Sequence, residues 1–284
     1  KNMSNKLCQN NNNNTIKNSG DDVDQRANYL TSTSRSGSGS PSMTRGSFNT
    51  SAAAIPSTPT ATSTGHHNNN NIINIIDSSN NNSSETITVS QFFGYVRTGN
   101  LQMVKYCVEQ HESFVNCRTI DEWQYTPLLW ASQLGQVEVV QYLMSKGADY
   151  TLEGKKIKWR PVLIACRYGH VDIVKIFLDV GEDVNIRLKH DNQFTPLHYA
   201  SQYGHPELAR LLLKYGADYT LVGGLGLRPI HTASNHGRTE VVDVLLDAGE
   251  DVNVVHSSEW KYTPLHWAVQ ENKIETCELL LKRG

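Results

Sequence analysis

The chain has 284 residues and a formal net charge of −2 at pH 7. Residues 1–89 carry six Lys or Arg against five Asp or Glu, and residues 90–284 carry twenty against twenty-three. Neither part has the basic excess that is typical of nucleic-acid-binding proteins, and no apolar run approaches the roughly 18–20 residues of a membrane-spanning helix. We therefore expect neither nucleic acid nor a membrane as a partner.

Residues 1–89 form a low-complexity segment rich in Asn, Ser and Thr, with Asn runs at 10–14, 68–71 and 80–82. Such a sequence buries too little apolar surface to offset the loss of chain entropy, so it predicts a disordered tail. The isoleucine-rich stretch 72–76 allows a second interpretation, a short linear motif or an aggregation-prone segment. We favour the disordered linker.

The five cysteines are odd in number and form no Cys-x-x-Cys pair. This usage favours a reducing compartment over a disulfide framework, so we expect a cytoplasmic or nuclear protein. Structural zinc ligands usually occur in close pairs, and for that reason we expect no metal site.

Beyond residue 90 one hexapeptide pattern recurs. TPLLWA begins at Thr126, RPVLIA at Arg160, TPLHYA at Thr195, RPIHTA at Arg228 and TPLHWA at Thr263, in steps of 34, 35, 33 and 35 residues. The first residue of each copy is a predicted helix N-cap position, and the following Pro occupies N1, where its missing N–H costs nothing. Two short helices per copy cannot bury both faces alone, so the copies must pack against one another as an array.

The TPLHxA pattern, the Gly-His pairs at 169–170 and 204–205 and the GAD or GED endings resemble the ankyrin repeat. The resemblance implies an all-α ankyrin-repeat solenoid of helix-turn-helix units with β-hairpin fingers, over residues 90–284. Units are predicted near 90–121, 122–155, 156–190, 191–223, 224–258 and 259–284, the last one incomplete. The first unit is atypical, as expected of a cap, and in it Ser90 takes the place of Thr126.

A second, longer repeat period, of two units, overlies the period of single units. The units at Thr126 and Arg160 resemble those at Thr195 and Arg228, which follow 69 and 68 residues later. Asn116, Asn185 and Asn253 each stand ten residues before the Thr of the next hexapeptide, whereas the alternate loops keep the shorter length usual in the family. The pattern predicts a duplicated two-repeat unit in which every second finger projects further.

The repeated motif residues are structural if the resemblance holds, since the motif His then ties adjacent fingers by hydrogen bonds. They are Thr126, Pro127, Pro161, Thr195, Pro196, His198, Pro229, His231, Thr263, Pro264 and His266. Helix packing places successive motif histidines about 10 Å apart, too far for one metal ion. Arg160 and Arg228 replace the N-cap Thr, and they are either a pair of basic groups for an acidic partner or drift at a tolerant position. We favour drift.

No catalytic motif is present in the sequence. Gly223, Gly224 and Gly226 weakly resemble a phosphate-binding loop, but they lack the preceding strand and the required glycine spacing, and a finger turn explains them. No nucleophile elbow, zinc-protease helix or kinase signature occurs. We therefore expect a protein that is not an enzyme and takes no cofactor.

Aromatic residues are the best candidates for partner contact, because aromatic side chains are favoured anchors at interfaces and these occupy variable repeat positions. The candidates are Leu134, at the same repeat position as Tyr168 and Tyr203, and the aromatic residues Trp123, Trp130, Trp159, Tyr168, Tyr199, Tyr203, His236, Trp260 and Trp267. Tyr125, Phe194 and Tyr262 either join them or cover the neighbouring hairpin, and the sequence leaves both interpretations open.

The predicted function is that of a monomeric scaffold or protein–protein interaction module, which binds a partner protein through the concave groove and fingers of the array. The alternative is the targeting arm of a larger multidomain protein, such as a BTB-type ubiquitin-ligase adaptor or a kinase. The segment DEWQYTPLLWA, which begins at Asp121, resembles the first repeats of ankyrin–BTB proteins.

Overall fold

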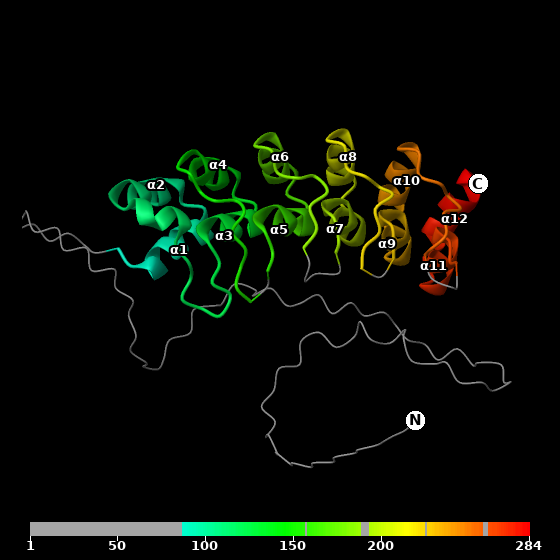
Figure 1. Cartoon of the computed structure of the whole chain (residues 1–284), viewed down its shortest axis with the longest axis horizontal. Coiled ribbons are helices and arrows are strands. Elements are labelled where there is room, and N and C mark those ends of the chain that lie inside the picture. Colours follow the sequence, from blue (N-terminus) through cyan, green and yellow to red (C-terminus); the bar gives the residue numbers. More distant parts are fainter. Residues whose placement is uncertain (1–86, 157, 189–192, 225, 258–260) are drawn as a thin grey trace, which may run out of the picture. The chain divides into compact units, whose positions relative to one another are not determined.

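A computed structural model describes residues 87–156, 158–188, 193–224, 226–257 and 261–284 (Figure 1). These residues belong to a single compact unit, Asn68–Gly284; a second unit, Lys1–His67, lies wholly outside the described residues. The predicted disordered tail therefore lies outside them as well, apart from its last three residues.

Consecutive helices pair throughout the described part of the chain. Its α-helices are α1 (Val89–Thr98), α2 (Leu101–Gln110), α3 (Pro127–Gln133), α4 (Val137–Ser145), α5 (Pro161–Tyr168), α6 (Val171–Asp179), α7 (Pro196–Tyr203), α8 (Pro206–Lys214), α9 (Pro229–Asn235), α10 (Thr239–Asp247), α11 (Pro264–Gln270) and α12 (Ile274–Arg283), and a 3₁₀ turn, η1 (Glu112–Asn116), follows α2. The predicted all-α fold built from repeated helix pairs is confirmed.

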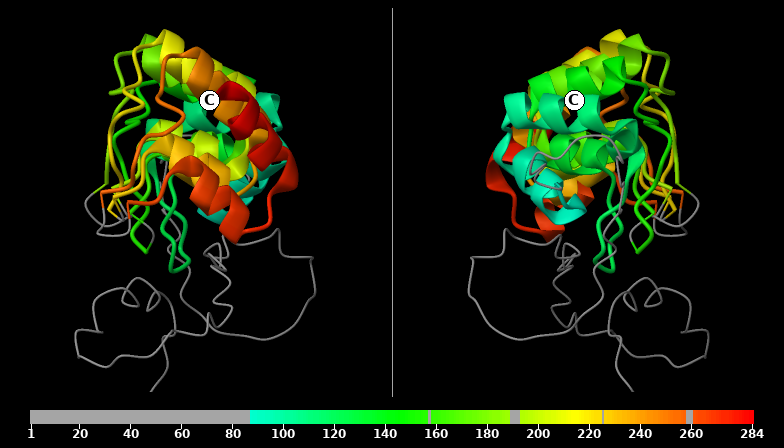
Figure 2. Two further views of the ribbon diagram at one scale, coloured as in Figure 1. Left: turned by 90° about the vertical axis from the view of Figure 1, so that its right-hand side faces the viewer. Right: turned by 90° about the vertical axis from the view of Figure 1, so that its left-hand side faces the viewer.

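The helices form two rows. Each odd-numbered helix packs against its even-numbered partner and against the odd-numbered helices before and after it. Figure 1 shows the even-numbered helices in an upper row, the odd-numbered helices in a lower row and the long loops extending beyond the lower row. Figure 2 shows that these loops all extend to the same side of the helices. We call the odd-numbered helices and the loops that precede them the inner face.

The inner helices approach one another closely because each presents an alanine at the contact. The alanine that ends each hexapeptide is fully buried in all five copies, at Ala131, Ala165, Ala200, Ala233 and Ala268. A larger side chain there would have to be accommodated in an interior that is already close-packed. The small residue thus sets the spacing of the row.

Local sequence explains where the inner helices begin. Thr126 accepts a hydrogen bond from the backbone N–H of Leu129 at 3.2 Å, as an N-cap should. The N-cap of the first helix is Thr88, two residues before the predicted Ser90, because Thr88 forms a capping box with Gln91. The capping box is a feature of the local sequence, and the spacing of the repeats does not predict it.

The fingers are loops closed by individual backbone hydrogen bonds, and the described residues contain no β-strand. The Thr119 N–H donates to the Tyr125 carbonyl at 2.9 Å, and the Gly223 N–H donates to the Leu227 carbonyl at 2.9 Å. Each of these two fingers therefore has a hairpin-type closure without a regular ladder. The connections 111–126, 180–195 and 248–263 have sixteen residues each, against fifteen in 146–160 and fourteen in 215–228.

Candidate protein-binding surface

The motif histidines of two units link one unit to the next. The Nδ1 atom of His198 accepts the Thr195 backbone N–H at 3.2 Å, which leaves the hydrogen of the neutral ring on Nε2. This Nε2–H donates to the carbonyl of Leu227 in the following loop at 2.9 Å, and His231 reaches the carbonyl of Val254 in the same way at 3.1 Å. Both rings are fully buried, whereas His266 in the last unit is exposed.

Burial controls the ionisation of these histidines. It lowers the pKa of His198 to about 4, against a smaller opposing effect of the hydrogen bond to Leu227. It likewise lowers the pKa of His231 to about 4. The links therefore depend on neutral rings and become unfavourable in acid.

Arg160 and Arg228 each form an ion pair within their own unit. The Arg160 guanidinium lies 2.8 Å from the Glu182 carboxylate, and Arg228 lies 3.0 Å from Glu250. Both glutamate side chains are almost fully buried, with 3% and 2% of their surface exposed. Burial raises the pKa of Glu182, and the Arg160 charge opposes this shift. The interpretation of these arginines as drift at a tolerant position is wrong, because each is the partner of a specific buried carboxylate.

The predicted partner-contact residues divide by exposure. Trp130, Trp159 and Tyr199 are buried, with 4%, 8% and 2% of their surface exposed, because each packs against neighbouring rings. Tyr168 is 39% exposed. Partly exposed residues are Trp123, Leu134, Tyr203, His236 and Trp267, and Trp260 lies outside the described residues. The first three therefore form the wall of the inner face, and the other described residues keep part of their surface exposed.

Of the three aromatic residues whose role was open, Tyr125 and Phe194 are buried in this wall and Tyr262 is partly exposed. Tyr125 is fully buried, and its ring centroid lies 5.5 Å from that of Trp130. Phe194 is buried and stacks on the ring of His198 at 4.9 Å. Tyr262 stacks in the same way on His266 at 5.3 Å. Phe194 and Tyr262 thus cover the motif histidines of their units, and Tyr125 packs against Trp130.

Two arginines cover the aromatic wall, and sequence reasoning missed both. The guanidinium of Arg97 lies 5.2 Å from the ring centroid of Trp130. That of Arg167 lies 5.2 Å from Trp159 and 5.1 Å from Tyr203. These distances are typical of cation–π interactions. Both arginines stand two residues before the glycine that ends their helix, a shared position that could have identified them.

The array of helix pairs with these linking histidines matches a known family. A family model described as Ankyrin repeats (3 copies) matches residues 66–154, 151–223 and 221–284. The chain belongs to the ankyrin-repeat family. Ankyrin repeats are generally protein–protein interaction modules and are typically not enzymes. The family match spans the array without counting its units, so the unit boundaries stay a prediction.

Nothing in the described part of this ankyrin chain suggests another class of site. None of its helices has the length and apolar character needed to cross a membrane. Those same ranges hold no group of three or more His, Cys, Asp or Glu side chains that could bind a metal ion. The four cysteines within them, Cys107, Cys117, Cys166 and Cys277, are free thiols.

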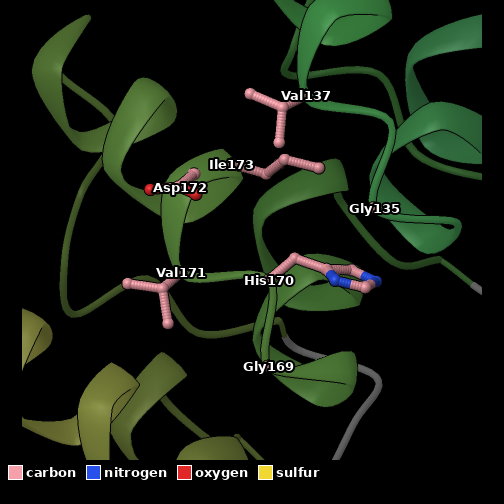
Figure 3. A pocket seen from close by; sticks show the side chains of 7 residues that line it. All are labelled: Gly135, Val137, Gly169, His170, Val171, Asp172 and Ile173. Carbon is pink, nitrogen blue, oxygen red and sulfur yellow. The ribbon is translucent and has the colours of Figure 1, made fainter.

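A pocket lies where one ankyrin unit meets the next, and it is a structural joint. Figure 3 shows the ring of His170 extending toward the turn at Gly135, with Val137, Asp172 and Ile173 around them. The Nε2–H of His170 donates to the Gln133 carbonyl at 3.0 Å, at the end of the preceding inner helix. The same joint recurs where His205 donates to the Arg167 carbonyl at 2.9 Å. The His ring is thus already used to cap a helix.

Replacing Gly135 by Ala should destabilise the array by about 2–3 kcal/mol. Gly135 has φ +72°, and a Cβ there would lie 2.7 Å from the His170 ring. The left-handed backbone alone costs roughly 1–2 kcal/mol for a residue with a Cβ, and displacing His170 adds the loss of its hydrogen bond. Urea denaturation measures the effect.

Gly147→Ala is the matched control. Gly147 has φ +81°, but a Cβ added there would have no atom within 4 Å, so this change should cost the backbone contribution alone. Equal losses of stability in the two variants would contradict the assigned role of His170.

Proposed function

We propose that the chain is a scaffold that binds a partner protein through its inner face. The observation that carries this proposal is the exposure of Tyr168, at 39%, beside Tyr203 and the guanidinium of Arg167. Tyrosine and arginine are enriched at the energetically important centres of protein interfaces. The buried rings beneath them hold this layer in place.

The linked units support the proposal energetically. Inner helices contact their neighbours, and His198 and His170 each bond to a carbonyl of an adjacent unit. A surface held in this way loses little conformational entropy when a partner binds. We infer a monomer that recognises protein and not nucleic acid, since residues 90–284 carry a net charge of −3.

A photo-crosslinking experiment tests the proposal. A benzophenone amino acid replaces Tyr168 in the full chain, and irradiated extracts are analysed by mass spectrometry. We expect a specific protein to crosslink at residue 168, because the exposed ring lies on the inner face. The matched control places the same amino acid at Tyr106 of α2, on the outer row, which is 51% exposed.

The expected result is about tenfold more of the crosslinked product at residue 168 than at residue 106, and loss of the product when Tyr203→Ala is added. Crosslinking of the same proteins at both positions would show that exposure alone explains the capture, and the inner face would then have no special role.

A further inference from the structure

Acidic residues are segregated between the two rows of helices. The inner helices α1, α3, α5, α7, α9 and α11 contain no Asp or Glu, and their charged residues are Arg97 and Arg167. The outer helices contain ten acidic residues against six Lys or Arg. The acidic ones are Glu109, Glu138, Asp172, Asp179, Glu207, Glu240, Asp243, Asp247, Glu275 and Glu278. The two rows therefore differ in the sign of their net charge.

Further cations gather on two adjacent loops of the inner face. Lys155, Lys156 and Lys158 lie on the loop before α5, Arg187 lies on the loop before α7, and all four are exposed. We call Lys155, Lys158 and Arg187 the finger cations. In the described ranges no carboxylate lies within ion-pair distance of any of the three.

The carboxylates on the preceding loop, at Asp121 and Glu122, are used elsewhere. Glu122 pairs with Lys156 at 2.7 Å, and the same ammonium lies 4.8 Å from the ring centroid of Trp123. Asp121 accepts hydrogen bonds from Thr119 Oγ1 and from the Trp123 N–H within its own turn. The finger cations therefore keep their charge uncompensated by these groups.

The loop that carries two of the finger cations is held by hydrogen bonds to backbone carbonyls. The Lys155 N–H donates to the Trp123 carbonyl of the preceding loop at 2.9 Å. Arg118 Nη1 bridges the same two loops, donating to the Gln124 carbonyl at 2.8 Å and to the Glu153 carbonyl at 2.9 Å. Lys155 and Lys158 thus lie on a loop that is held in place on the same face as the exposed ring of Tyr168 and the arginine-covered wall.

We propose that the partner enters the inner face with an acidic segment that also carries aromatic or aliphatic side chains. Its carboxylates meet the finger cations, and its apolar groups pack on Tyr168 and Tyr203. This inference rests on the proposed function and specifies the partner. Protein is favoured over nucleic acid because the cations are confined to one region, while the outer helices repel a polyanion that extends beyond it.

Fluorescence anisotropy with defined probes tests the inference on the full chain. The probes are a labelled peptide that alternates Glu with Phe and Leu, the same peptide with Lys in place of Glu, and a single-stranded oligonucleotide. The finger variant is K155E/R187E/K158E, which leaves the Lys156–Glu122 pair intact. The matched control variant, K105E/K214E/K282E, changes three exposed lysines of the outer helices and alters the net charge equally.

We expect the acidic peptide to bind at least about tenfold more tightly than the basic one at physiological salt. The finger variant should weaken this binding at least about tenfold, and the outer variant should change it less than about twofold. Circular dichroism verifies that both variants are folded.

Three outcomes would overturn the inference: no binding of the acidic peptide, equal weakening by the two variants, or tighter binding of the oligonucleotide. None of these outcomes contradicts the proposed function, because crosslinking at residue 168 reports partner binding whatever the partner's charge. Loss of that crosslink would instead remove the proposed function itself.

Discussion

The R160T/E182A double variant is expected to be at least as stable as the wild type, although each single change alone costs about 2–3 kcal/mol. Arg160→Thr leaves the Glu182 carboxylate, which is 3% exposed, without its partner. Glu182→Ala likewise leaves the Arg160 guanidinium, which is 17% exposed, without its partner. Breaking a buried pair on one side is costly, whereas removing both partners is often neutral. Urea denaturation at pH 7 measures the four members of the cycle.

The double variant also restores a hydrogen bond. At Thr126 and Thr195 the hydroxyl accepts the N3 backbone N–H, at 3.2 and 3.4 Å, and such a cap stabilises a helix by about 1 kcal/mol. The exposed Glu207–Arg210 pair is the control, and removing either partner should change stability by less than about 0.5 kcal/mol. If the effects of R160T and E182A simply add in the double variant, the two side chains are not coupled.

Mild acid is expected to weaken the array through its buried histidines. The folded-state pKa values of His198 and His231 lie at about 4, below the value near 6.5 of the unfolded chain. The unfolded state therefore takes up protons first, and stability is lost as the pH falls from about 6.5 towards 4. Between pH 7 and about pH 5.5 the loss should be about 1 kcal/mol per histidine, reaching about 3 kcal/mol each below pH 4.

His198→Leu separates the two contributions of this side chain. At pH 7 the variant should lose about 1–3 kcal/mol, because the Leu227 carbonyl loses its Nε2–H donor. Its further loss between pH 7 and about pH 5.5 should be about 1 kcal/mol smaller than that of the wild type. In stronger acid the raised pKa of Glu182 has the opposite effect and increases the stability of the folded state. The range from pH 7 to about pH 5.5 is therefore the one that reports on the histidine.

A control at the same motif position is available in the last unit. His266 is exposed, so His266→Leu should change stability at pH 7 by less than about 1 kcal/mol. The unit at Thr126 already has a fully buried Leu129 at this position, which shows that the packing accepts leucine. A pH dependence in H198L equal to that of the wild type would remove His198 from the explanation.

Repetition made the fold predictable. Five copies of one hexapeptide at nearly constant spacing, with a Pro at N1 in each, predict the inner helices at Pro127, Pro161, Pro196, Pro229 and Pro264, where the structure begins them. No comparable repetition marks the first unit, and there a local signal, the capping box of Thr88 and Gln91, sets the helix start. Where several copies share the spacing, the repeat period predicts the residue at which a helix begins. In the first unit the capping residues determine it.

The surface was harder to predict because periodicity locates a residue on a helix without revealing what covers it. Trp130 and Tyr199 occupy the variable hexapeptide position expected to meet a partner, yet neighbouring rings bury both. The two Arg–Glu ion pairs, by contrast, could have been predicted from the sequence. Twenty-two residues after each arginine stands a glutamate, at Glu182 and Glu250, and twenty-two after Thr126 and Thr195 stands an alanine. This covariation within one chain is the signature of a contact.

The alternating Arg–Glu pairs have a consequence for how such a chain can change its length. Units with Thr and Ala follow the sixteen-residue loops, and units with Arg and Glu follow the shorter ones. Excising one unit would place two loops of the same length class next to each other, whereas excising two in succession keeps the alternation. We therefore expect a pair of units to be the exchangeable cassette of this protein.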